Sequence, residues 1–343
     1  MTDTNQHLGY IDFVKGVAAL SVILLHTLPS VVLKGSFAVY HIWQAVPVFL
    51  FISFYLGFRN FEKKDGVIKD YYSIARIKKL FTKIWLPLLL LAGFEAIYFF
   101  VIGNNSRAIG SLLCYDNGPG SYYVWCYMQI WLLMPLIYLL LKRRGVVYGG
   151  GYLLIISLLL DFVWERYSGI KPGYTCFRYL FLSVPAYMFL KNIEVKKILP
   201  LAMISMVYLA LMMYSKVPTL ADSVLPDGWE AQTSLSYFYT LLLVVIVSKM
   251  YDKIKPSRIK GYISHLGTMS WEVFLVQMVL IGSGVLSYVS SKLFQSILLQ
   301  IGFKVVAALV ITVVIAELYK RLLGILVYAK HRLDNPVAGI NKS

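Results

Sequence analysis

Charged residues are scarce in this chain of 343 residues, at 15% of the sequence, whereas soluble domains carry about 25%. Hydrophobic residues make up 59%. About ten apolar runs approach the roughly 20 residues that a helix needs to cross a bilayer. Repeats, low-complexity stretches and linkers are also lacking, so nothing divides the chain. The composition therefore predicts an all-α, polytopic membrane helix bundle, with residues 1–343 forming a single domain.

Acidic residues are few, and 17 Asp and Glu stand against 33 Lys and Arg, for a net charge of +16. Of the 33 basic residues, 24 fall in segments that lie on the same side of the predicted membrane, namely 59–83, 142–144, 191–197, 249–260 and 320–343. This positive-inside pattern predicts that both termini are cytoplasmic and argues against nucleic acid as a partner. The predicted spans are approximately 11–33, 39–58, 80–103, 121–141, 146–164, 176–190, 198–214, 234–251, 266–288 and 296–326.

Cysteine is almost absent, with three residues that show no Cys-x-x-Cys spacing. A metal cage with neighbouring histidines is therefore not expected, nor any permanently bound metal or cofactor. Cys114, Cys126 and Cys176 all fall towards the predicted outer side. A Cys114–Cys176 disulfide and free thiols both remain open.

The first apolar run, "IDFVKGVAALSVILLH", contains three polar residues that are costly inside a membrane. Lys15 and His26 are eleven residues apart, which in an α-helix is about three turns plus roughly 20°. They are therefore predicted to share one helical face. Asp12 stands three residues before Lys15, close enough to form an ion pair with it.

His26 is the candidate general base, because a neutral imidazole with a pKa near 6.5 can accept a proton from a hydroxyl and return it. The alternative for a lone histidine in a membrane helix is a hydrogen bond to a neighbouring helix. For Lys15 the alternative is a cation that extends to the membrane interface.

Four further segments follow the one that carries Asp12, Lys15 and His26. They are "AVPVFLFISFYL", the basic "ARIKKLFTKIWLPLL", the Trp- and Tyr-rich "GPGSYYVWCYMQIWLLMPLIYLL" and "LGTMSWEVFLVQ". In this order the five segments resemble the acyltransferase 3 family, integral membrane enzymes that O-acylate bacterial surface sugars. The family has Asp, Arg and His in the first segment and a basic Arg-x-x-Arg pattern in the third. The sequence departs from the family at Lys15 for Arg, Phe54 for Gly and Gln277 for His.

The resemblance implies that His26 is the catalytic base, with Lys15 and Asp12 at the entrance to its site, acting in direct transfer or through an acyl-histidine. It further implies acyl-CoA as donor. The predicted CoA-binding residues are Ser53, Arg76, Lys78, Lys79 and Lys83. For the basic residues among them, positive-inside topology and contact with lipid headgroups are the alternative.

An acceptor sugar would bind in an aromatic and polar pocket near the outer ends of the helices. The predicted acceptor-binding residues are Tyr122, Tyr123, Trp125, Gln129, Asp161, Glu165 and Arg178, with Glu95 as a group that could orient His26 or Arg178. Interfacial aromatic belts and helix caps are their alternative.

The resulting expectation is an O-acyltransferase of the bacterial inner membrane that moves an acetyl or other short acyl group from CoA to a glycan hydroxyl. The departures at Phe54 and Gln277 motivate the alternative of a glycan or lipid-linked-sugar transporter built on the same scaffold. Expected partners are acyl-CoA, a glycan or glycolipid acceptor and membrane lipids, and the oligomeric state stays open.

Overall fold

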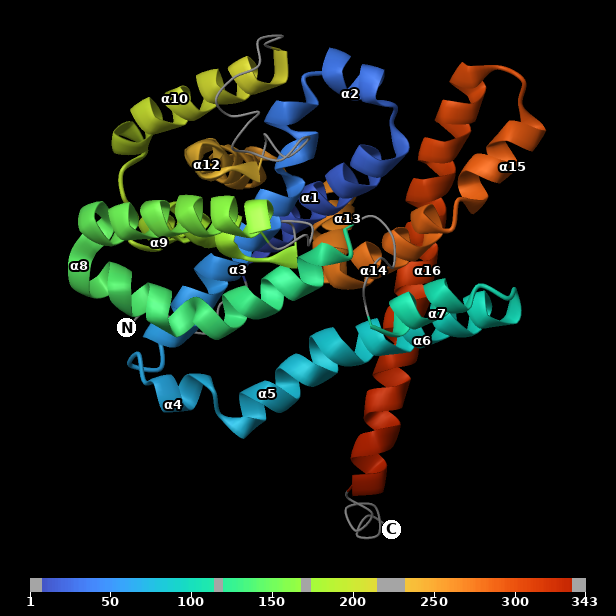
Figure 1. Cartoon of the computed structure of the whole chain (residues 1–343), viewed down its shortest axis with the longest axis horizontal. Helices are drawn as coiled ribbons and strands as arrows, with labels where there is room; N and C mark the ends of the chain where they lie inside the picture. The colour runs from blue at the N-terminus through green and yellow to red at the C-terminus, as the bar shows by residue number, and fades with distance from the viewer. Residues whose placement is uncertain (1–7, 114–119, 168–173, 215–231, 335–343) are drawn as a thin grey trace. The chain divides into compact units, whose positions relative to one another are not determined.

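The computed structural model describes residues 8–113, 120–167, 174–214 and 232–334, which form helices and no strand (Figure 1). The predicted all-α membrane fold is confirmed. Cys114 lies outside the described residues. Cys176, its predicted partner for a disulfide, is buried.

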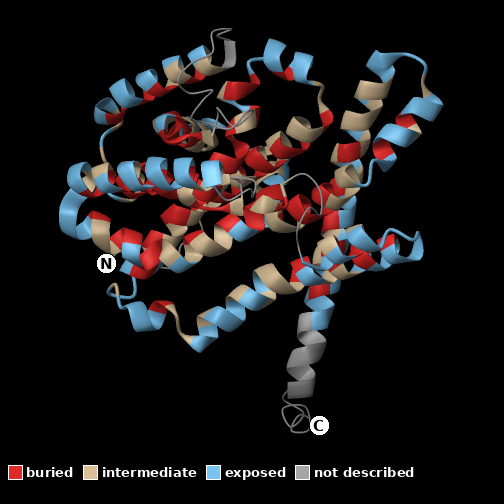
Figure 2. Ribbon diagram, in the orientation of Figure 1, coloured by how far each residue is buried: buried red, intermediate tan, exposed pale blue. Residues whose placement is uncertain are grey.

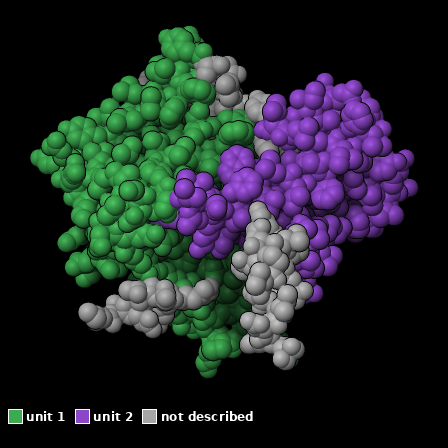
Figure 3. Space-filling view, turned by 90° about the horizontal axis from the view of Figure 1, so that it is seen from below, with its two compact units in different colours: residues 1–73, 120–268 green, residues 74–119, 269–343 purple. Residues whose placement is uncertain are grey.

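The described chain divides into two compact units, each built from two separate stretches of sequence (Figure 3). Unit 1 comprises residues 1–73 and 120–268, and unit 2 comprises residues 74–119 and 269–343. The expectation of a single domain stays a prediction.

Unit 1 contains most of the polar residues that the sequence analysis selected. Its helices are α1 (Gly9–Thr27), α2 (Ser30–Gly35), η1 (Ala38–Tyr40), η2 (Ile42–Gln44), α3 (Ala45–Glu62), α4 (Ile68–Tyr71), α8 (Tyr122–Tyr167), η5 (Phe177–Leu182), α9 (Ser183–Leu190), α10 (Val195–Tyr214), η7 (Ser234–Ser236), α12 (Tyr237–Lys253) and α13 (Arg258–Thr268).

Unit 2 holds the basic segment and the last helices of the chain. Its elements are α5 (Ile74–Leu80), the π-helical turn η3 (Phe81–Trp85), α6 (Leu86–Val101), α7 (Asn105–Leu112), α14 (Ser270–Gly282), α15 (Val285–Leu293) and α16 (Ile297–Asp334). Within this unit the Tyr319 hydroxyl of α16 donates a hydrogen bond to the Pro87 carbonyl of α6, and the Arg107 guanidinium donates to the Gly282 carbonyl at 3.0 Å. These bonds tie its two stretches of sequence together.

Seven helical segments among the described residues are long and apolar enough to cross a membrane, or eight if the broken pair α13 and α14 is counted as one span. The predicted number of about ten and the predicted sides of the termini stay predictions. The difference in number has two sources. The 43-residue segment Tyr122–Trp164 counts once although Gly145 (φ 73°) breaks its helix, and Phe177–Leu190 is shorter than a usual span.

One predicted boundary is wrong. The sequence analysis continues the first helix to residue 33, whereas α1 ends at Thr27 and a separate helix begins at Ser30. Leu28 has extended backbone angles because it precedes Pro29, whose ring disfavours the helical conformation in the residue before it.

The helices differ in how much of their surface is buried (Figure 2). In the most apolar stretch of Ala38–Glu62, 67% of the residues are buried. In the corresponding stretch of Ile297–Leu326, 11% of the residues are buried. Because apolar side chains are stable against lipid, an exposed apolar helix such as α16 is typical of a lipid-facing element. The span containing α3 belongs to the interior of unit 1.

Candidate active site

The predicted ion pair on α1 is confirmed. The Lys15 ammonium lies 2.8 Å from a carboxylate oxygen of Asp12, and the Lys15 side chain is 23% exposed. Pairing lowers the cost of placing these two charges at a membrane helix. The pair leaves the lysine partly accessible at the N-terminal end of the helix.

His26 lies at the other end of the same unbroken helix and is half-buried. Within the described residues no protein group forms a hydrogen bond with its imidazole. The interhelical hydrogen bond that was the alternative explanation is therefore not observed there. Both ring nitrogens remain available for proton transfer.

Helix α13 packs against α1 with its backbone. A Cβ atom on Gly16 would lie 1.9 Å from the Ile263 carbonyl oxygen, and one on Gly267 would lie 1.7 Å from the Asp12 carbonyl oxygen. Real Cβ atoms do not approach other atoms this closely, so only glycine fits at either position. Gly267 belongs to the segment "LGTMSWEVFLVQ", and the contact joins that segment to the one carrying the Asp12–Lys15 pair.

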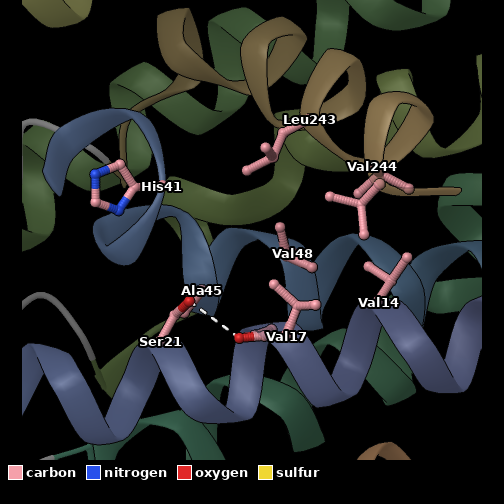
Figure 4. Close-up of a pocket in the computed structure, with 10 residues that line it drawn as sticks. Val14, Val17, Ser21, His41, Ala45, Val48, Leu243 and Val244 are labelled. Carbon is pink, nitrogen blue, oxygen red and sulfur yellow. Dashed lines mark hydrogen bonds between the residues drawn. The ribbon is translucent and has the colours of Figure 1, made fainter. Parts of the chain in front are cut away.

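A small cavity of about 60 Å³ lies on another side of α1 (Figure 4). Val14, Val17 and Ser21 of α1 line it together with aliphatic residues of α3 and α12 and with His41, and the Ser21 hydroxyl donates to the Val17 carbonyl at 3.0 Å. At 100° per residue these positions are centred roughly 120–140° away from the Lys15–His26 face. The cavity is therefore not part of the face that carries the candidate base.

Ser53 and Tyr123 were predicted to bind different substrates, and the structure brings them together. The Ser53 hydroxyl donates to the Phe49 carbonyl in its own helix at 2.8 Å, and its side chain also hydrogen-bonds with Tyr123 of α8. Tyr123 is buried, at 9% exposure. This contact fixes α3 against the aromatic start of α8.

Asp161 and Arg178 form a buried ion pair, with a guanidinium nitrogen 3.1 Å from a carboxylate oxygen. The side chain of Arg178 is 1% exposed and that of Asp161 is 9% exposed. The Tyr237 hydroxyl donates to the Arg178 carbonyl at 3.0 Å. The pair joins the second half of α8 to η5. Each of the two buried charges is therefore neutralised by the other.

Both polar atoms of the Gln129 side-chain amide form hydrogen bonds with backbone groups. Its nitrogen donates to the Tyr174 carbonyl at 2.8 Å, and its oxygen accepts from the Cys176 backbone N–H at 2.9 Å. Nearby, Tyr122 hydrogen-bonds with Gln232 and Tyr179. These contacts anchor the segments that follow the broken helix α8.

Trp125 is the most exposed of the predicted acceptor residues whose side chains are described, at 37%. The side chain of Glu165 lies outside the described part. The acceptor roles of all these residues stay predictions.

The predicted CoA-binding cations lie in unit 2. Arg76, Lys78 and Lys79 lie on α5, and Lys83 lies in the π-helical turn η3. The three lysines are exposed and Arg76 is half-buried. π-Helical turns are rare and occur frequently at functional sites. Glu95 of α6 is buried in the same unit, whereas His26 and Arg178 belong to unit 1, so its suggested partnership with them stays a prediction.

Comparison with known families decides the class of the protein. The model of the acyltransferase domain family Acyl_transf_3 matches residues 8–317. The chain belongs to this acyltransferase family. It is a multi-pass membrane acyltransferase. Comparison with curated proteins and with solved structures gave no match.

Besides Lys15, two positions of this acyltransferase depart from the pattern of the resembling segments, and both are buried. Phe54 is fully buried and packs against Phe58, with ring centroids 5.8 Å apart. Gln277 on α14 is also fully buried, and neither polar atom of its amide has a hydrogen-bond partner among the described residues. An unpaired buried amide costs roughly 1–3 kcal/mol. Phe54 therefore fills the core, whereas nothing in the structure explains Gln277.

The sequence analysis missed Gly16 and Gly267 as determinants of the site. The close approach of two helices more than 200 residues apart leaves no periodic signal, although the position of Gly267 inside a family-like segment was a clue.

Among the described residues no group of three or more His, Cys, Asp and Glu is placed to share a metal ion. The site therefore consists of the Asp12–Lys15 pair, His26 and the helix α13 that holds them.

Proposed function

We propose that this membrane acyltransferase moves an acetyl or other short acyl group from acyl-CoA to a hydroxyl of an envelope or exported glycan. The observation that carries the proposal is the arrangement on α1. An ion-paired lysine at one end and, at the other, a histidine with no hydrogen bond to any described residue lie on one helix of a chain that belongs to an acyltransferase family.

His26 is the general base of the proposed reaction. Its neutral imidazole takes the proton of the acceptor hydroxyl as that oxygen attacks the thioester carbonyl carbon. A carbon–oxygen bond forms, the carbon–sulfur bond breaks, and the CoA thiolate leaves with the proton that the imidazolium returns. The products are an O-acyl ester and CoA with a free thiol.

The binding of the donor's phosphates is assigned to the basic segment of unit 2, and a role of Ser53 of unit 1 in donor binding stays a prediction. Phosphate groups of CoA are bound by cations, and Arg76, Lys78, Lys79 and Lys83 supply four of them. Lys15, which lies 2.8 Å from a carboxylate oxygen of Asp12, acts at the entrance of the route towards His26. On the predicted topology the N-terminal end of α1 faces the cytoplasm, which is where acyl-CoA is found.

The acceptor is assigned to the opposite end of α1, on the side of the aromatic start of α8. Trp125 is exposed there and offers an apolar face for a sugar ring. Tyr122, Gln129 and the buried Asp161–Arg178 pair shape this region through their hydrogen bonds. We place the protein in the bacterial cytoplasmic membrane.

Mass spectrometry of envelope and exported glycans tests the reaction and the acceptor together. Cells with the protein are compared with cells that lack it and with cells that carry His26→Ala. We expect an acyl mass difference that requires both the protein and His26. Glycans that are acylated equally in all three would contradict the proposal. Failure of export without any change in acylation would instead support a transporter.

A further inference from the structure

A second cavity in unit 1 lies away from the Lys15–His26 face. It has a volume of about 320 Å³, at the lower end of the range of about 300–1,000 Å³ for small-molecule sites. It lies where α9 ends, α10 begins and α12 ends. Since α10 begins and α12 ends here and both belong to candidate spans, we expect the cavity to open at one boundary of the membrane.

The polar side of this cavity comes mainly from one face of α12. Asp252 is four residues after Ser248 and three after Lys249, so it lies beside both on α12, and Glu194, just before α10, also lines the cavity. Lys249, Asp252 and Glu194 form no ion pair among the described residues. The cavity therefore presents one cation and two carboxylates that have no ion-pair partner in the described part of the chain.

Two of these groups are in unfavourable positions as the protein stands. The Ser248 hydroxyl oxygen is buried and has no hydrogen-bond partner within the described part of the chain. Asp252 lies in the last turn of α12, where the negative end of the helix dipole disfavours a carboxylate. A ligand that brings a hydrogen-bond acceptor to Ser248 and a cation to Asp252 would relieve both.

The charges select the ligand. A polyanion such as CoA would meet two carboxylates for one lysine, and a simple amine would leave Lys249 unpaired. A zwitterion satisfies all three, with a phosphate on Lys249 and Ser248 and a primary ammonium between Asp252 and Glu194. The remaining lining is apolar, including Ile193, Ile198 and Val245, and it lies at the membrane boundary.

We propose that this cavity binds the headgroup of a phospholipid that carries a phosphate and a primary amine, namely phosphatidylethanolamine. The lipid belongs to the leaflet on the side of the loop between α9 and α10. That side is cytoplasmic on the predicted topology, because this loop and the segment after α12 are rich in lysine. The site is separate from the acyltransferase chemistry.

The test measures retained lipid on the purified full-length protein by native mass spectrometry. The protein is equilibrated with mixed micelles that hold equal amounts of phosphatidylethanolamine, phosphatidylglycerol and phosphatidylcholine. We expect phosphatidylethanolamine to be retained preferentially, because phosphatidylglycerol has no amine and the choline group has no N–H to donate. Equal retention of the three lipids would overturn the proposal.

Charge-removing variants locate the site. The double variant Glu194→Gln, Asp252→Asn should retain phosphatidylethanolamine about tenfold less or worse, because it loses two charge-assisted hydrogen bonds. Lys249→Met should weaken retention similarly. Asp70→Asn and Lys253→Met remove exposed charges that do not line the cavity and should change nothing. Unchanged retention in the double variant would contradict the site, whatever the acyltransferase activity shows.

Discussion

The backbone carbonyl oxygen of Asp12 occupies the space in which a side chain on Gly267 would begin, since a Cβ atom there would lie 1.7 Å away. The contact places the backbone of α13 directly against the helix that carries Lys15 and His26. A Cβ atom on Gly16 would lie almost as close, 1.9 Å from the Ile263 carbonyl oxygen. The packing of α13 against the N-terminal part of α1 therefore requires glycine at both Gly16 and Gly267.

Gly267→Ala should separate α1 from α13 and lower both stability and activity. Overpacking costs about 1–3 kcal/mol, and here the obstacle is backbone, which cannot rotate away as a side chain can. The measurement is the thermal unfolding midpoint in detergent together with the rate of acyl transfer.

Gly261→Ala is the matched control, because it lies on the same helix and an added Cβ meets nothing within 4 Å. Alanine is favoured over glycine inside a helix by about 1 kcal/mol. The control should therefore be neutral or slightly stabilising. If Gly267→Ala behaved like Gly261→Ala, the close contact between the helices would be wrong.

The buried pair of Asp161 and Arg178 should act as a structural unit. Asp161→Ala leaves the guanidinium without its carboxylate, and removal of one partner of a buried pair costs about 3–5 kcal/mol. Replacing both residues with apolar ones should recover much of that loss. Thermal unfolding of the two single variants and the double variant forms the required cycle.

The exposed pair of Glu62 and Lys191 provides the control for this cycle, with side chains 42% and 37% exposed. Exposed ion pairs contribute about 0–1 kcal/mol, so Glu62→Gln should hardly change stability. Similar losses for the exposed and the buried pair would contradict the buried character of the Asp161–Arg178 pair.

Lys15→Arg should preserve or raise activity, because the resembling family carries arginine at this position and the charge beside Asp12 is retained. Lys15→Met should lower activity, since it removes the cation and leaves the partly buried carboxylate of Asp12 without this partner. The comparison is kcat/KM for both variants. Complete loss of activity in Lys15→Arg would show that this lysine has another role.

The basic segment of unit 2 should determine affinity for the donor. The double variant Arg76→Met, Lys79→Met removes two cations and should raise KM for acyl-CoA about tenfold or more while changing kcat less. Lys63→Gln, Lys64→Gln removes two exposed charges from the same predicted cytoplasmic loop outside the segment. Equal effects of both double variants would indicate a general charge effect and not a CoA site.

The fold class and the Asp12–Lys15 pair could be predicted from sequence because both depend on local information. The length of an apolar run can be read directly from the sequence and indicates whether it can span a membrane. Residues three apart in a helix lie side by side. The end of α1 at Thr27 was missed although Pro29 signals it. The Gly267–Asp12 contact and the Asp161–Arg178 pair join separate helices, and helical periodicity does not specify which helices meet. The cavity beside Lys249 could not be predicted for the same reason.

The most direct test of the account is acyl transfer by purified protein that carries His26→Ala or His26→Gln. Labelled acyl groups are followed from acyl-CoA to glycan, and thermal unfolding verifies that each variant is folded. His41→Ala is the control, because His41 is exposed, lies away from the Lys15–His26 face and hydrogen-bonds to the Ser36 carbonyl. We expect a loss of about 10²–10⁴-fold for both His26 variants and wild-type activity for His41→Ala. Wild-type activity in folded His26→Ala would contradict the central claim.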